Sequence, residues 1–156
     1  MPTLRSAPTA EGSLRIGGDD VERFAAASGD RNPLHLDAQF ARRTAFGEPV
    51  VHGALVTLAL LGLLPDDALA AARGLRVSFS GPVLRDIDAA AAAGPDERLE
   101  GGWWATLSAR GKDVTRVRLW SAGGPLEPPA EVDLVEDAPM RDRPAVVVVD
   151  ALSESR

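Results

Sequence analysis

The chain has 156 residues, of which 45% are hydrophobic and 26% charged, so it can bury the core of one ordinary domain and is not expected to be disordered as a whole. It contains no cysteine, which excludes a disulfide framework and a metal site built on thiolates. The formal net charge is −6 and no block of basic residues is present, so nucleic-acid binding is not expected.

The two ends of the chain differ in composition from its middle. Residues 1–13 contain no apolar segment of the kind found in a secretory signal, and the longest apolar run, 53–64, is too short to span a bilayer comfortably. We therefore expect a cytoplasmic protein with no membrane partner. Residues 121–156 hold 8 acidic and 3 basic residues, so this proline-rich tail carries nearly all of the negative excess.

The first third of the chain predicts a short strand followed by helices. The strand is 13–16, and 19–28 combines an acidic start with apolar residues at helical spacing, ended by Gly29. Pro33 restricts the next segment to a rigid turn, which precedes a short helix at 38–46.

The segment 50–64, VVHGALVTLALLGLL, is apolar on nearly every side. In a protein without a membrane span, such a segment predicts a buried helix. Pro65 ends it.

The second half of the chain predicts strands. Residues 75–80 alternate apolar and polar side chains, and 99–111 with 113–123 predict a hairpin around RGKD. The run DIDAAAAAG (86–94) is ambiguous, because alanine favours a helix whereas its place between two strands favours a strand. PAVVVVD (144–150) has strong strand propensity and could add to a sheet edge or dock on another chain. Helices and strands segregated in this way predict an α+β fold, with a helix packed against an antiparallel sheet.

One acid and one of the two histidines lie on either side of the proline turn, in SGDRNPLHLD. Asp30 and His35 could converge on one small molecule, and a carboxylate beside an imidazole suits acid–base chemistry, including activation of a water. The alternative is purely structural: Asp30 caps backbone amides of the turn while His35 satisfies a buried carbonyl. The residues by themselves leave both interpretations open.

The second histidine stands where the apolar helix is expected to begin. His52 precedes Gly53, and the first amides of a helix have no internal partners and lie at the positive end of the helix dipole. Such a position can hold an oxygen that gains negative charge in a reaction, or His52 can simply cap the helix or pack in the core. A metal site would need more ligands than His35, His52 and the nearby carboxylates obviously supply, so none is expected.

Residues 24–55, FAAASGDRNPLHLDAQFARRTAFGEPVVHGAL, closely resemble the MaoC-like family of dehydratases, which includes the (R)-specific enoyl-CoA hydratases. The resemblance implies a hot-dog fold, an antiparallel sheet wrapped around a central helix, and turns the alanine run at 89–93 into a strand. It extends over 13–120, leaving 1–12 as an N-terminal extension and 121–156 as an acidic tail with one possible extra strand. Because hot-dog sites usually form between two units, it also implies a homodimer.

The same resemblance assigns roles to the site residues. Asp30 and His35 become a catalytic dyad that holds a water, Gly53 binds the thioester carbonyl, and Asn32 and His52 support the site. The implied reaction interconverts trans-2-enoyl and (3R)-3-hydroxyacyl thioesters. No cofactor is implied, since coenzyme A or the phosphopantetheine of an acyl-carrier protein enters only as part of the substrate.

Two departures from the family pattern concern the surroundings of the dyad. Leu61 stands where related bacterial hydratases often have a serine, and Arg85-Asp86 replaces a glycine-aspartate. Two alternatives to the hydratase follow: a specialised dehydratase of a carrier-bound, polyketide-like intermediate, and a non-catalytic subunit that binds acyl chains or completes a heteromer. A hot-dog thioesterase is disfavoured, because the central helix offers no carboxylate.

Overall fold

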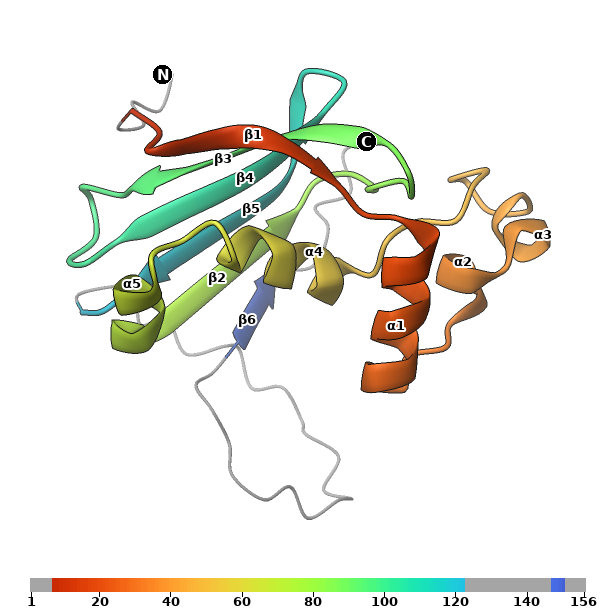
Figure 1. Ribbon diagram of the computed structural model, residues 1–156, viewed down its shortest axis with the longest axis horizontal. Helices are drawn as coiled ribbons and strands as arrows, with labels where there is room; N and C mark the ends of the chain where they lie inside the picture. Colours follow the sequence, from red (N-terminus) through yellow and green to blue (C-terminus); the bar gives the residue numbers. More distant parts are fainter. Residues whose placement is uncertain (1–6, 123–146, 151–156) are drawn as a thin grey trace, which may run out of the picture.

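The computed structural model describes residues 7–122 and 147–150 and contains helices and strands in an α+β arrangement (Figure 1). Three or more strands that share one apolar face need a covering element, and here a helix covers the sheet. In chain order the elements are β1 (Ala10–Arg15), α1 (Gly18–Ser28), α2 (Pro33–Leu36), α3 (Ala38–Ala41), α4 (Gly53–Leu61), α5 (Asp66–Ala71), β2 (Gly74–Phe79), β3 (Asp88–Pro95), β4 (Trp103–Ala109), β5 (Lys112–Trp120) and β6 (Val147–Asp150).

The strands form one sheet in the order β1-β3-β4-β5-β2-β6. All neighbours are antiparallel except β6, which pairs with β2 in parallel. The predicted hairpin is confirmed: β4 and β5 are joined at Arg110 and Gly111, whose φ angles of 53° and 76° match the positive φ that a two-residue hairpin turn with the right twist needs. The first strand begins at Ala10, three residues earlier than predicted, because its pairing with β3 starts there.

The alanine run is a strand, as the family resemblance implied. β3 is paired along its length with β1 on one side and β4 on the other. Ala89, Ala91 and Ala93 are at most 5% exposed and belong to the core, which gives the run the period of two that a strand requires. Hydrogen bonding to two neighbours and burial of one face therefore override the helix propensity of alanine.

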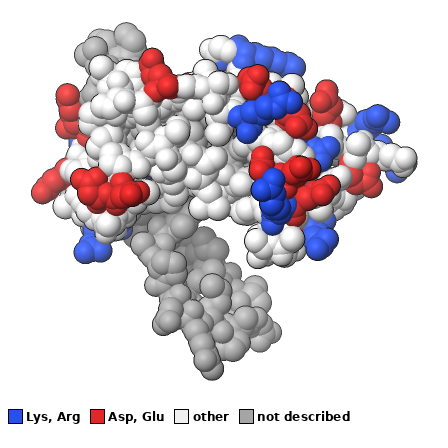
Figure 2. Space-filling model, viewed as in Figure 1, with Lys and Arg blue, Asp and Glu red and all other residues white. Residues whose placement is uncertain are grey.

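The apolar helix α4 lies on the sheet, contacting β4 and β5, but it is shorter and less buried than predicted. It begins only at Gly53, because Val50 forms a bridge with Leu84 and so keeps the preceding chain extended. Leu60 is fully buried, whereas Leu58 is 57% exposed. The described residues of the chain thus do not bury this helix on every side. Figure 2 shows the face over α4 free of the charged side chains that gather over α1–α3.

The segment expected to be a turn contains the additional short helix α2. Asn32 is its N-cap and accepts a hydrogen bond from the amide of Leu34 at 3.0 Å, while Pro33 occupies the first helical position. An N-cap asparagine followed by proline is a favourable helix start. Proline has no backbone N–H, but at the first helical position this N–H would have no acceptor within the helix, so nothing is lost. The helix before it ends as predicted at Gly29, which has a φ of 77°. Helices α1–α3 cluster beside the N-terminal end of α4 (Figure 1).

In the described part of the chain, the two outermost strands of the sheet are β1 and β6. β6 pairs with β2 through the register Leu75–Val147 to Ser78–Asp150, so part of the predicted extra strand adds to a sheet edge. Neither β1 nor β6 has an outer neighbour among the described strands. The remaining tail and the first six residues lie outside the described residues. No helix among those that the structure describes is long and apolar enough to cross a membrane.

The cap of α2 leads to a stability prediction. Asn32→Ala removes the acceptor for the amide of Leu34 and should lower the free energy of unfolding by about 1 kcal/mol. Asn32→Ser keeps an oxygen at the same place and should retain most of that stability. Urea denaturation of the two variants and the unsubstituted protein measures the difference, and equal stability of both variants would show that the cap contributes nothing.

Candidate active site

Asp30 lies in the loop between α1 and α2, where it makes hydrogen bonds to residues two positions away on either side. Its amide donates to the hydroxyl of Ser28 at 3.2 Å, and its Oδ1 accepts from the amide of Asn32 at 3.1 Å. The second carboxylate oxygen, Oδ2, has no hydrogen bond of this local kind, and the side chain is 50% exposed. Asp30 therefore does cap a backbone amide of the turn, and this role uses only Oδ1 of its carboxylate.

His35 projects from α2 and is fixed by a backbone carbonyl. Its Nδ1 lies 2.9 Å from the carbonyl oxygen of Val50. Because a carbonyl oxygen only accepts, the hydrogen bond places the proton on Nδ1 and leaves Nε2 as a lone pair in the neutral imidazole. The structural role considered for His35 is thus also observed, while its other nitrogen stays available. The imidazole is held by the carbonyl of Val50.

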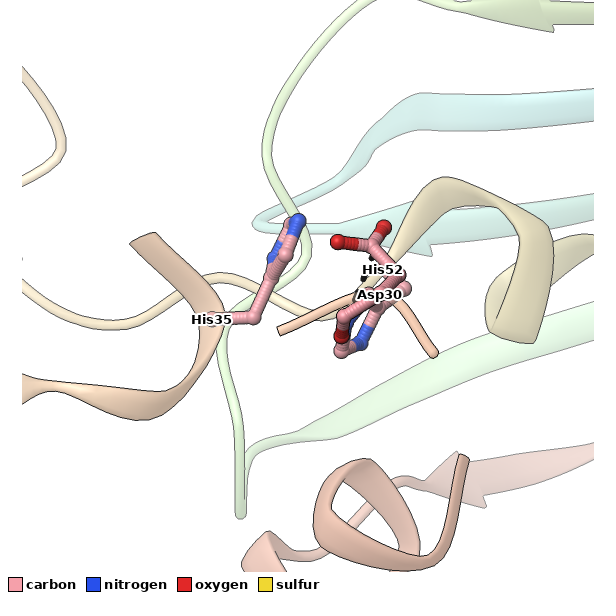
Figure 3. Close-up of side chains that lie close together, drawn as sticks. All are labelled: Asp30, His35 and His52. Atoms are coloured by element: carbon pink, nitrogen blue, oxygen red, sulfur yellow. Dashed lines mark hydrogen bonds and ion pairs between the residues drawn. The ribbon is translucent and has the colours of Figure 1, made fainter. Parts of the chain in front are cut away.

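His52 lies between the two predicted catalytic residues and the start of α4. It is 2% exposed, and its Nε2 is 3.1 Å from the carbonyl oxygen of Asp30 and 3.9 Å from Oδ2 of the same residue. Its ring stacks on that of His35, with centroids 3.8 Å apart and planes inclined by 29°. Figure 3 shows the carboxylate of Asp30 next to both imidazoles. The structure therefore brings all three polar residues into one cluster.

Gly53 is the first residue of α4. The first hydrogen bond within the helix runs from the amide of Val56 to the carbonyl of His52, so the amides that precede Val56 have no acceptor inside the helix. A Cβ on Gly53 would lie 3.0 Å from the ring of Phe79, so the glycine also lets the helix start approach the sheet closely. The amide of Gly53 and the positive end of the helix dipole are available to an oxygen at this position.

The same cluster contains three side chains that could ligate a metal ion. Asp30, His35 and His52 each offer one ligand atom, and these atoms lie within 4.8 Å of one another. The rings of His35 and His52 are stacked, however, with planes inclined by only 29°. Because each nitrogen lone pair lies in the plane of its ring, and these two planes meet far from both rings, one ion cannot be bound by both rings at an ordinary Zn–N distance. One nitrogen of each ring is also engaged with a carbonyl. The cluster therefore fits a polar substrate better than a cation.

Two site features were not foreseen from the sequence. The stacking of His35 on His52 joins residues 17 positions apart and has no local signal. The packing of Phe79 against Gly53 is likewise tertiary. By contrast, α2 could have been found from its asparagine-proline start.

The departures noted in the sequence lie away from the cluster. Leu61 is the last residue of α4, about 12 Å from Gly53 along the helix axis, and it packs against the core. Asp86 adopts a φ of 61° and its amide bonds to the carbonyl of Ile16. Neither position contacts the dyad through a hydrogen bond of the described residues.

Comparison with known proteins places these features in a family. The family model described as "MaoC like domain" matches residues 2–94. The (R)-specific enoyl-CoA hydratase of Aeromonas caviae is 54% identical over 52 residues, 33% of this chain and 39% of that protein. The 3-hydroxybutyryl-CoA dehydratase of Methylorubrum extorquens is 53% identical over 38 residues, 24% of each chain. The matched segments thus span well under two thirds of these relatives.

Solved structures extend the likeness to the fold. The (R)-hydratase from A. caviae involved in PHA biosynthesis has a TM-score of 0.59 and 31% identity, covering 76% of this chain and 96% of that one. An R-hydratase from Pseudomonas aeruginosa has a TM-score of 0.55 and 30% identity, covering 74% and 79%. The hot-dog fold predicted from the sequence is therefore confirmed, and the chain belongs to the MaoC-like family of hydratases and dehydratases.

Proposed function

We propose that this protein is a hydro-lyase that interconverts trans-2-enoyl thioesters and (3R)-3-hydroxyacyl thioesters. The observation that carries the proposal is that Asp30 Oδ2 and His35 Nε2 both remain available beside the uncapped start of α4. Acid–base groups and an oxyanion donor in one place are what addition of water to a conjugated thioester requires. Membership of a family that contains hydratases and dehydratases supports the same reaction.

In the proposed reaction, Asp30 and His35 hold one water beside the double bond. The water oxygen bonds to C3, the C2–C3 π bond breaks, and its electrons move through the carbonyl onto the thioester oxygen. The amide of Gly53 and the dipole of α4 stabilise that oxygen. The water's proton passes to the dyad, and a proton returns to C2 from the same side, so the overall change is syn addition of water. Dehydration follows the reverse path.

The dyad is tested with substitutions that keep its local hydrogen bonds. Asp30→Asn retains the oxygen that accepts from Asn32, and His35→Asn can still donate to the carbonyl of Val50. Each should lower kcat by about 10²- to 10⁴-fold, because general acid–base catalysis contributes that much. Hydration of crotonyl-CoA and longer trans-2-enoyl-CoAs is the assay, with the thermal midpoint as the control for folding. Activity that survives both substitutions would rule out the dyad.

The oxyanion role of Gly53 is tested with a pair of variants at the same position. Proline is tolerated at the first helical position, so Gly53→Pro removes the amide donor while keeping the helix. Gly53→Ala keeps the donor and meets Phe79 in the same way, which makes it the matched control. We expect kcat of the proline variant to be about 10²- to 10³-fold below that of the alanine variant. Equal kcat in the two variants would contradict the role.

The thioester carrier distinguishes the leading proposal from its alternative. The names of the relatives from A. caviae and M. extorquens refer to coenzyme A esters, so coenzyme A is the carrier that we propose. Leu61, which packs at the end of α4, is the change that favours an unusual acyl group. Turnover of carrier-protein thioesters without turnover of coenzyme A esters would favour the specialised biosynthetic dehydratase.

We further propose that a second copy of the chain covers the exposed side of α4, giving a homodimer. Leu58, at the middle of α4, is 57% exposed. Figure 2 shows no charged side chain of the described residues over this helix. The residues of α4 are apolar except for Thr57, and an exposed apolar helix face on a folded chain is typical of an interface. Because Gly53 begins the same helix, the second copy would also shield the substrate and its single reacting water from bulk solvent.

The interface prediction uses two exposed apolar residues of similar size. Leu58→Glu places a charge in the proposed contact and should convert the dimer to a monomer, as measured by sedimentation velocity. Ile87→Glu, at a residue 52% exposed in the loop before β3, is the control and should remain dimeric. A monomeric unsubstituted protein, or a Leu58→Glu variant that stays dimeric, would contradict the proposal.

A further inference from the structure

We infer that His52 is a positioning residue: a hydrogen bond from its Nε2 holds the loop of Asp30, and its ring supports the ring of His35. In this role the proton of His52 lies on Nε2, whereas the proton of His35 lies on Nδ1. The inference rests on the proposed function of the dyad, but the tautomers themselves can be measured without substrate. It assigns to His52 more than packing: a hydrogen bond to one member of the dyad and a stacked ring against the other.

The carbonyl partners decide where the imidazole protons lie. Nε2 of His52 is 3.1 Å from the carbonyl oxygen of Asp30, and this oxygen can only accept, so Nε2 carries the proton. Nδ1 of His52 is buried and has no hydrogen-bond partner, so a proton there would have no acceptor. For His35 the carbonyl of Val50 fixes the proton on Nδ1 instead. The two stacked rings therefore carry their protons on different nitrogens.

This arrangement leaves a single imidazole lone pair accessible to the reaction. His35 Nε2 is free and belongs to a half-buried side chain, whereas the lone pair of His52 is on the buried Nδ1. His52 is 2% exposed, while the carboxylate of Asp30 beside it is 50% exposed. A group that is shielded in this way does not exchange protons with a bound water. His52 thus acts on the reaction only through the residues that it holds.

The positioning has a mechanical basis in the three elements that meet at His52. It is the N-cap of α4, its Nε2 bonds to the loop that carries Asp30, and its ring supports the imidazole of α2. Phe24 of α1 also contacts it, with ring centroids 4.9 Å apart and planes inclined by 55°. A shift of His52 would move the acid, the base and the oxyanion amide relative to one another, and small misplacements of this kind are costly to catalysis.

The tautomers are tested directly by NMR of the imidazole nitrogens. The chain has two histidines, so four ring nitrogens account for every imidazole signal. In the uniformly ¹⁵N-labelled, full-length protein at about pH 8, where an ordinary histidine is neutral, we expect His52 to be protonated at Nε2 and His35 at Nδ1. His35→Asn assigns the signals. The same tautomer at both histidines, or an Nδ1 proton on His52, would overturn the inference.

The positioning role is tested with two amides of different reach. The side-chain nitrogen of His52→Gln can take the place of Nε2 and donate to Asp30, whereas that of His52→Asn lies nearer to Nδ1 and cannot. We expect kcat of the asparagine variant to be about tenfold below that of the glutamine variant, with KM little changed, because one net hydrogen bond is worth up to about that factor. Equal kcat in the two variants would overturn the role.

The outcomes separate this inference from the proposed function. If Asp30→Asn and His35→Asn retain full activity, the hydratase dyad is wrong, whatever the tautomers are. If those variants are inactive while the glutamine and asparagine variants of His52 are equally active, the dyad stands and the positioning role fails. Should neither His52 variant fold, the NMR result on the unsubstituted protein still decides the tautomer.

Discussion

The site depends on where α4 begins. The backbone at this point is fixed from three directions: the amide of Val51 bonds to the carbonyl of Val83 at 2.7 Å, Gly53 packs against Phe79, and His52 bonds to the carbonyl of Asp30. A helix exposes its unpaired amides and its positive dipole end only at its first turn. Anchoring this turn to the sheet and to the Asp30 loop therefore sets the direction in which a substrate oxygen can be bound.

The proposed catalytic residues also serve the fold, and the two roles use different atoms. Asp30 holds the turn through Oδ1 and keeps Oδ2 available, while His35 bonds to Val50 through Nδ1 and keeps Nε2 available. A side chain whose first polar atom is fixed by the backbone loses little further rotamer freedom when the second atom binds a substrate. This sharing of roles explains how a half-exposed carboxylate on a loop can be held in a defined geometry.

Much of the fold was predictable, because it rests on local patterns. The spacing of apolar residues predicted α1 and the strands of the β4–β5 hairpin, and a continuous apolar run predicted α4. Gly29 marked the end of α1. The alanine strand was not predictable from propensity, since its conformation is imposed by pairing with two neighbouring strands; only the family resemblance indicated it. The extent of α4 was also mispredicted, because the bridge between Val50 and Leu84 keeps the preceding chain extended.

The sequence by itself determined the chemical inventory: an acid, an imidazole and a glycine at a helix start, in an order typical of one family. Only the tertiary structure decided how these groups are used. It stacked His35 on His52 across a separation of 17 residues and gave each ring a different carbonyl partner. These contacts depend on the packing of α1, α2 and α4 around one buried side chain. No periodicity or short motif encodes such packing, because its geometry arises from elements distant along the chain.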